Sequence, residues 1–244
     1  MARHRVLVLA LFAAACSSGT STPAPERSAC AHERFEGSSF LVCIPPSGAR
    51  LKLYAAAKDE SPKRHFQDLG LDQASVAFAM NAGMFDEAGR PIGLAVVDGH
   101  PVHPIALRPG GGNFGMKPNG VFLVHKSGAA EIVVSEKYRA DADIAFATQS
   151  GPMLVIEGRL HPQFAPDGES RNMRNAVGIA PGGKPSFVMS EDPVSLGKLA
   201  RFFRDRLKVR DALYFDGSVS SLWNPADGRL DDFTDLGPII VATK

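Results

Sequence analysis

Short apolar runs, separated by clusters of Gly, Pro, Asn and Asp, dominate the chain from residue 39 onward. Runs of this length that are rich in Val, Ile and Phe are typical of β-strands, and the residues between them are typical of turns. The pattern predicts strands at residues 39–44, 52–56, 75–80, 93–97, 120–124, 131–134, 144–148, 153–157, 176–180, 186–189, 212–215 and 238–242.

One stretch has a clear helical period. Ser195 is a good N-cap, and the residues after it place apolar side chains on one face and charged side chains on the other. The apolar face holds Leu196, Leu199, Ala200, Phe203 and Leu207, and the charged face holds Lys198, Arg201, Arg204 and Asp205. A weaker helix is predicted at 62–69. Many strands with one clear packed helix predict a single α+β domain, with a mixed multi-stranded sheet core and long Gly- and Pro-rich loops.

The first residues have the pattern of an export signal. A positive start is followed by an apolar run up to Ala15, too short to span a bilayer as a mature helix. Small residues precede Cys16, as at a lipoprotein cleavage site, but Ala13 stands where leucine is usual, so simple cleavage remains an alternative. We therefore expect a signal peptide at 1–15, a lipidation site and flexible tether at 16–29, and one domain at 30–244.

Charge and cysteine content narrow the partners and the compartment. The net charge is +1 and no polybasic run occurs, so we expect no nucleic acid and no membrane contact except through a lipid anchor at Cys16. Cys30 and Cys43 form an even pair in an exported chain, which predicts a disulfide, with two buried free thiols as the alternative. We expect the bacterial periplasm or cell envelope.

Several familiar motifs are absent or incomplete. Residues 110–115 fit the G-x-G-x-x-G spacing but lie between Pro109 and Pro118, so we expect an ordered loop and no dinucleotide. His100 and His103 flank a turn, and no H-E-x-x-H, paired C-x-x-C or G-x-S-x-G occurs. We predict no metal and no cofactor, although calcium held by scattered Asp side chains and carbonyls stays open.

Small polar clusters follow or separate predicted strands at four places: residues 80–85, 119–120, 149–152 and 216–218. Strand ends that converge at one sheet edge are common places for a site, although Asn-Gly and Asp-Gly most often simply form turns.

Together these clusters resemble the phosphodiester glycosidase family, which includes the mannose-6-phosphate uncovering enzyme and many exported bacterial proteins. The segments are similar to the family's N-G-G-F-F, N-G before a strand, S-G-P-x-L, R-[TS]-A-[VI]-G, the start of its helix, and D-G-G-x-S-S-x-L. In this chain they read Asn81-Ala82-Gly83-Met84-Phe85, Asn119-Gly120-Val121-Phe122, Ser150-Gly151-Pro152-Met153-Leu154, Arg174-Asn175-Ala176-Val177-Gly178, Ser195-Leu196-Gly197-Lys198-Leu199-Ala200, and Asp216-Gly217-Ser218-Val219-Ser220-Ser221-Leu222.

The resemblance implies hydrolysis of a sugar-1-phosphodiester from an extracytoplasmic glycan, with release of free sugar. A phosphate leaves as a stabilised anion, so a cation and a carboxylate matter more than a strong proton donor. The demands of this reaction, taken with the resemblance, make Asp216 and Arg174 the candidate catalytic residues; an Asx turn at Asp216 and an ordinary surface arginine at Arg174 are the alternatives. The candidate substrate-binding residues are Asn81, Gly83, Asn119, Gln149, Ser150, Gly151, Gly217, Ser218 and Ser220.

The chain departs from the family's pattern at Ala82, Asn175 and Ser218. These departures leave two alternatives open: a non-catalytic glycan- or phosphosugar-binding envelope lipoprotein, and a periplasmic scaffold.

Overall fold

The computed structural model of the chain describes residues 27–108 and 110–244. The predicted signal peptide and Cys16 lie outside the described residues. No helix within these two ranges is long and apolar enough to cross a membrane.

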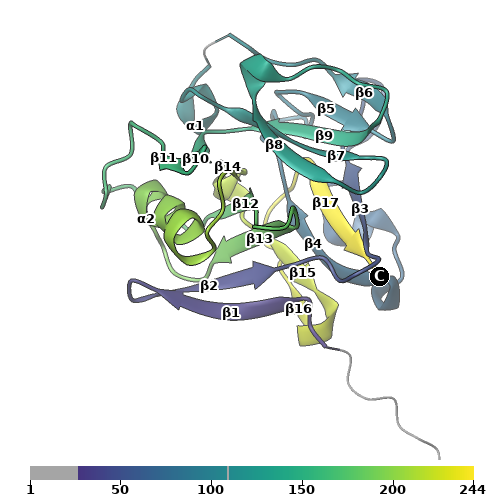
Figure 1. The fold of residues 1–244 in the computed structure, drawn as a ribbon. Helices are drawn as coiled ribbons and strands as arrows, with labels where there is room; N and C mark the ends of the chain where they lie inside the picture. The colour runs from purple at the N-terminus through teal and green to yellow at the C-terminus, as the bar shows by residue number, and fades with distance from the viewer. Residues whose placement is uncertain (1–26, 109) are drawn as a thin grey trace, which may run out of the picture.

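The strands form three sheets, and every pairing between neighbours is antiparallel (Figure 1). The seven-stranded sheet has the order β1 (Cys30–Phe35), β2 (Ser38–Cys43), β13 (Pro185–Ser190), β12 (Asn175–Ile179), β14 (Ala212–Tyr214), β10 (Met153–Ile156) and β11 (Arg159–Leu160). One five-stranded sheet has the order β16 (Arg229–Leu230), β15 (Leu222–Asn224), β4 (Val76–Asn81), β17 (Ile239–Thr243) and β3 (Arg50–Tyr54). The other has the order β6 (His100–His103), β5 (Ala95–Val97), β9 (Ile144–Ser150), β7 (Gly120–His125) and β8 (Ala130–Val134).

Each strand predicted from the sequence has a counterpart in these sheets, with ends that shift by a few residues. The predicted α+β class and single domain are confirmed, but the strands are divided among three sheets, and these sheets are antiparallel where a mixed sheet core was predicted. Five strands were not predicted from the sequence: β1, β6, β11, β15 and β16. Four of the five are edge strands, whose exposed and partly exposed residues leave little apolar alternation to detect; β15 lies next to an edge and is buried, but it has only three residues.

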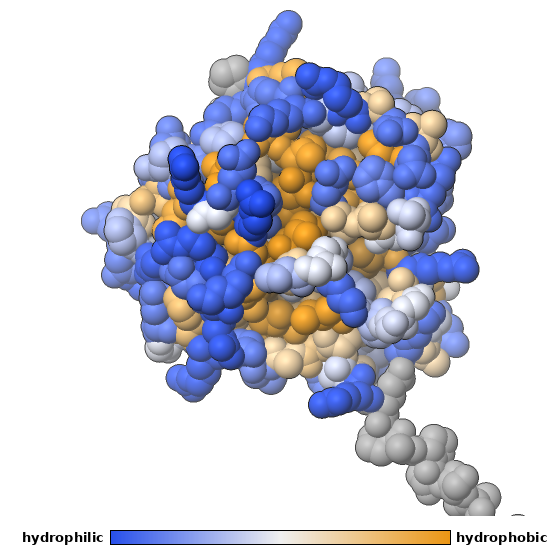
Figure 2. Space-filling model, in the orientation of Figure 1, coloured by the Kyte–Doolittle hydropathy of each residue, from blue (hydrophilic) through white to orange (hydrophobic). Residues whose placement is uncertain are grey.

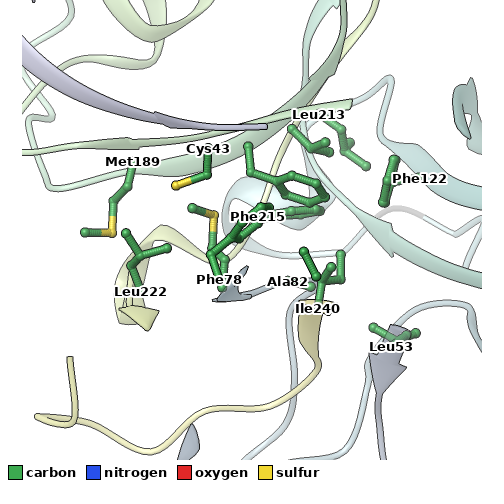
Figure 3. Close-up of a cluster of buried hydrophobic side chains, with 14 of the residues drawn as sticks. Cys43, Leu53, Phe78, Ala82, Phe122, Met189, Leu213, Phe215, Leu222 and Ile240 are labelled. Atoms are coloured by element: carbon green, nitrogen blue, oxygen red, sulfur yellow. The ribbon is translucent and has the colours of Figure 1, made fainter. Parts of the chain in front are cut away.

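The inner faces of the three sheets share one apolar core (Figure 3). Leu213 and Phe215 enter it from the segment around β14, Phe78 from β4, and Phe122 from β7. Phe122 packs edge-on against Phe187 at 5.7 Å between ring centroids. Because its side chains come from all three sheets, this core holds the sheets in fixed relation to one another.

Figure 2 shows apolar residues reaching the surface in the middle of one face, surrounded by hydrophilic residues.

The outer face of the seven-stranded sheet carries helix α2 (Leu196–Arg201), which continues as a π-helical turn, Phe202–Arg206. The Ser195 hydroxyl accepts a hydrogen bond from the Lys198 N–H, as predicted for an N-cap. Lys208, at φ 58°, follows the end of the helix. This sheet is thus covered on both faces.

The second predicted helix, at 62–69, is wrong in extent: only the 3-10 turn Phe66–Leu69 forms there. Its single buried side chain, Phe66, provides too little apolar surface to fix a longer helix. The Gly-rich loop contains one helical turn, α1 (Gly112–Gly115). Further 3-10 turns are Gln73–Ser75, Ser135–Lys137, Gly217–Val219 and Pro225–Asp227.

The predicted disulfide between Cys30 and Cys43 is present. The two residues are directly paired across β1 and β2, so the bond closes the hairpin at its open end.

Candidate active site

Asn81, the last residue of β4, connects three strand ends. Its side-chain amide donates to the Asp216 backbone carbonyl at 2.7 Å. Its oxygen accepts from the Ser221 N–H and the Asn175 side-chain amide, both at 2.9 Å. Because these contacts occupy both ends of a buried amide, Asn81 holds the segments after β14 and at the start of β12 together.

Asp216 follows β14 and begins the turn Gly217–Val219. Its N–H donates to the Ala82 carbonyl at 3.0 Å, and its carboxylate accepts from the Ser218 N–H at 3.1 Å. Burial raises the pKa of Asp216 above its ordinary value, and hydrogen bonds from Ser218 lower it in part. Asp216 is thus held through both its main chain and its side chain, and its carboxyl retains its proton more strongly than that of an exposed aspartate.

Arg174 lies immediately before β12 and is almost completely buried, with 2% of its surface exposed. Its guanidinium donates to the Val194 carbonyl at 2.8 Å, the Tyr214 hydroxyl at 2.8 Å and the Ser170 carbonyl at 3.0 Å. No carboxylate pairs with it within the described ranges. The contacts of Arg174 are therefore with the protein itself, and its positive charge is not neutralised by an ion pair.

Tyr214 connects Arg174 with the turn after Asp216. A Cβ atom added at Gly217 would lie 1.8 Å from the Tyr214 hydroxyl, so only glycine fits there. Burial raises the pKa of Tyr214, and the adjacent Arg174 guanidinium acts in the opposite direction. Arg174 thus positions the Gly217 turn through the tyrosine hydroxyl.

Two of the residues that depart from the family's pattern, Asn175 and Ala82, are buried next to Asn81. The Asn175 amide donates to the Asn81 carbonyl at 2.8 Å, and the Asn175 oxygen accepts from the Ser220 hydroxyl at 3.2 Å. Ala82 is fully buried in the apolar core. The third departure, Ser218, is exposed. Of the three departures, only Ser218 changes the accessible surface of the site.

Asn119, Gln149, Ser150 and Gly151 form a neighbouring group at the end of β9. Gln149 is saturated by the protein, since its oxygen accepts from the Leu94 and Ala106 N–H groups and its amide donates to the Ala106 carbonyl and the Ser135 hydroxyl. The Asn119 side chain likewise bonds to the Lys117 ammonium and the Phe114 carbonyl.

Ser150 and the two glycines complete that group. The Ser150 hydroxyl is buried and has no hydrogen-bond partner in the described part of the chain. A Cβ at Gly151 would lie 2.5 Å from the Asn119 Cβ, and a Cβ at Gly83 would lie 2.5 Å from the Thr148 hydroxyl. Gly83 therefore permits the segment after Asn81 to pack directly on the end of β9, and the two groups are neighbours.

A pocket of about 310 Å³ opens beside the Asp216 turn. Predicted residues Gly217, Ser218 and Ser220 line it. The rest of its lining is Asn172, Met173, Met189, Arg229, Asp231 and Phe233. The lining does not include Asp216, Arg174, Asn81, Gly83 or any member of the Asn119 group, and Asp216 adjoins the pocket only through Gly217. Their roles in catalysis or substrate binding remain predictions.

Tyr214 and the 229–233 segment were not predicted from the sequence to belong to the site. A tyrosine in an otherwise apolar strand was one available signal, because a buried hydroxyl needs a partner. A second was the dense Arg-x-Asp-Asp-Phe run directly after a Gly turn, where an aromatic residue has no strand or helix period to explain it.

Among residues 27–108 and 110–244, no group of three or more His, Cys, Asp or Glu side chains is arranged to hold a metal ion.

Residues 74–230 match a protein-family model described as phosphodiester glycosidase. The uncharacterized protein YigE of Escherichia coli (strain K12) is 35% identical over 151 residues, covering 62% of this chain and 59% of that protein. The chain thus spans about three fifths of that relative's length.

Solved structures share the fold at low identity. The zebrafish N-acetylglucosamine-1-phosphodiester alpha-N-acetylglucosaminidase catalytic domain, auto-inhibited by its pro-peptide, has a TM-score of 0.59 at 14% identity, covering 88% of this chain and 81% of that one. A hypothetical protein from Synechocystis has a TM-score of 0.56 at 15% identity, covering 88% and 61%. A putative exported protein from Burkholderia pseudomallei K96243 has a TM-score of 0.52 at 14% identity, covering 84% and 73%.

Proposed function

Since the chain belongs to the phosphodiester glycosidase family, we propose that it hydrolyses a sugar-1-phosphodiester and releases the free sugar. The observation that carries the proposal is the half-buried Asp216 carboxyl beside a pocket lined by Gly217, Ser218 and Ser220.

In the proposed reaction the bond between the anomeric carbon and the phosphate oxygen breaks. Its electron pair leaves with the phosphate, and a water oxygen becomes bonded to the anomeric carbon. Asp216 stabilises the positive charge that develops at the anomeric carbon. It acts either as the nucleophile or as the base that activates the water, and the proton of the water finally passes to solvent. A phosphate monoester is a stable leaving group, so one carboxylate suffices.

Arg174 acts electrostatically and at a distance, because its guanidinium is bonded to the Tyr214 hydroxyl and does not line the pocket. Its charge has no carboxylate partner in the described residues, and burial reduces screening by water, so its field extends toward the Gly217 turn. We propose that this field stabilises the departing phosphate without direct contact.

We further propose that the protein acts outside the cytoplasm, in the bacterial periplasm or envelope, and that Cys16 carries a lipid anchor. The Cys30–Cys43 disulfide supports an oxidising compartment. Intact mass measurement of the mature protein tests lipidation, because a diacylglyceryl group adds a defined mass at Cys16 that simple cleavage does not.

The test of activity incubates the purified protein with a panel of sugar-1-phosphodiesters, beginning with that of N-acetylglucosamine, and identifies products by mass spectrometry. Wild type is expected to release free sugar, and Asp216→Asn is expected to bind without turnover. Asp98→Asn, at an exposed carboxyl away from the pocket, is the matched control and should retain full activity. Absent turnover in wild type, or equal turnover in Asp216→Asn, contradicts the proposal. Sugar-phosphate binding without turnover in any form supports a binding lipoprotein instead.

A further inference from the structure

The 229–233 segment forms one wall of the pocket and lies outside every motif that carries the family resemblance. Arg229 is fixed in the β15–β16 pairing, opposite Asn224. Asp231 is fixed by accepting the Leu222 N–H at 3.0 Å. Since Arg229, Asp231 and Phe233 alternate along this segment and all line the pocket, the wall is built from side chains on one side of the chain.

Phe233 is 72% exposed, the largest exposure among the large apolar side chains of the described residues. Met173, also exposed, and Met189, with 2% of its surface exposed, line the same pocket. An exposed aromatic ring at a pocket rim has little structural purpose by itself, because folding leaves most of its surface in water. Its negatively polarised face suits the C–H groups of a sugar ring.

The charged side chains beside Phe233 compensate one another. The Arg229 guanidinium contacts both Asp231 carboxylate oxygens, at 2.9 and 3.1 Å, and lies 3.5 Å from Glu191. Two carboxylates around one guanidinium disfavour a phosphate at this wall. The pair nevertheless presents donors and acceptors side by side, which suits neutral hydroxyl groups.

We propose that Phe233, Arg229 and Asp231 form the sugar-binding wall of the pocket, stacking on one pyranose ring and bonding its hydroxyls. This inference rests on the proposed function, and it orients the substrate: the ring lies on the 229–233 side and the phosphodiester on the Gly217 and Ser218 side, beside Asp216. A pocket of about 310 Å³ is near the lower end of the ligand range, roughly 300–1,000 Å³, and accepts one ring with its phosphate.

The test uses three substitutions in the purified full chain. Phe233→Ala removes the ring, Phe233→Tyr retains an aromatic face, and Leu230→Ala is the matched control. Leu230 is exposed and belongs to the same segment, but it does not line the pocket. Calorimetry measures binding of methyl pyranosides of glucose, galactose, mannose and N-acetylglucosamine. Steady-state kinetics with the phosphodiester that wild type hydrolyses gives kcat and KM.

We expect Phe233→Ala to weaken methyl pyranoside binding and raise KM by about tenfold, as loss of roughly one ring face of apolar contact implies, with kcat within about twofold of wild type. Phe233→Tyr and Leu230→Ala should match wild type. Unchanged binding and KM in Phe233→Ala, an equal effect of Leu230→Ala, or failure of wild type to bind any of the four pyranosides overturns the inference. Pyranoside binding that depends on Phe233 in a protein without turnover would sustain this wall while refuting the hydrolase.

Discussion

Removing one oxygen atom from Tyr214 tests whether Arg174 is held as described. In Tyr214→Phe the ring remains in the core, but the Arg174 N–H that donates to the hydroxyl at 2.8 Å loses its acceptor. A hydrogen bond to a charged group contributes about 1.5–3 kcal/mol, and a buried donor without a partner keeps its desolvation penalty. For a chain of this size that loss lowers Tm by about 3–12 °C.

The assay is urea and thermal unfolding followed by circular dichroism. Tyr138→Phe is the control, because the Tyr138 side chain is partly buried, whereas Tyr214 is fully buried, and the Tyr138 hydroxyl makes no hydrogen bond within the described ranges. It should change the free energy of unfolding by less than about 0.5 kcal/mol. If the two variants are equally stable, the Arg174–Tyr214 contact contributes nothing and the positioning role assigned to Arg174 is refuted. A fall in kcat larger than the fall in folded fraction would show that the same contact also positions the Asp216 turn.

Three other predictions concern the same region and the hairpin beside it. Asp216→Asn should raise Tm at pH 7 but not at pH 3. Because burial raises the pKa of Asp216, the folded chain loses stability as the pH rises from the ordinary pKa of 3.8 to the raised pKa. The uncharged amide removes this loss of stability. Gly217→Ala should destabilise the fold by about 1–3 kcal/mol and abolish turnover, because the new methyl group meets the Tyr214 hydroxyl; differential scanning calorimetry and the product assay measure both. Replacing Cys30 and Cys43 together by serine should cost about 3 kcal/mol, measured by urea unfolding with and without reductant.

Each of these has an internal control. The pH experiment compares wild type and variant at both pH values, and a stability difference that does not change with pH would contradict it. Gly111→Ala, where no atom lies within 4 Å of the added Cβ and φ is −86°, should be neutral or slightly stabilising. Reductant should destabilise wild type and leave the double serine variant unchanged; equal sensitivity would mean that the disulfide is not the target.

The sequence predicted the parts of this fold that are determined locally. β14 could be found because Leu213 and Phe215 alternate with Tyr214 between two apolar layers, and α2 because Ser195 caps it. β1 could not, because its exposed and partly exposed polar residues leave no apolar face to detect. A strand of that kind is fixed by its neighbour and its disulfide.

The candidate site was predictable as a set of residue types but not as a geometry. The order of the clusters identified Asp216, yet strand alternation alone could not show that Arg174 turns toward Tyr214 while Asn175 turns toward Asn81. Phe233 escaped notice because it belongs to an irregular segment, and its position depends on a pairing between β15 and β16 that the sequence does not display.

The hydrogen bonds of Asn81 also determine when the protein acquires its site. Its partners Asn175, Asp216 and Ser221 stand 94, 135 and 140 residues away along the chain. Contacts of such long range form slowly because closing the long intervening loops costs entropy, and none of them exists while the nascent chain still ends before residue 175. A ribosome therefore carries a growing polypeptide that contains Asn81 but no site. If the chain crosses the membrane before it folds, its activity begins only after export, and cytoplasmic sugar phosphates do not encounter the completed pocket.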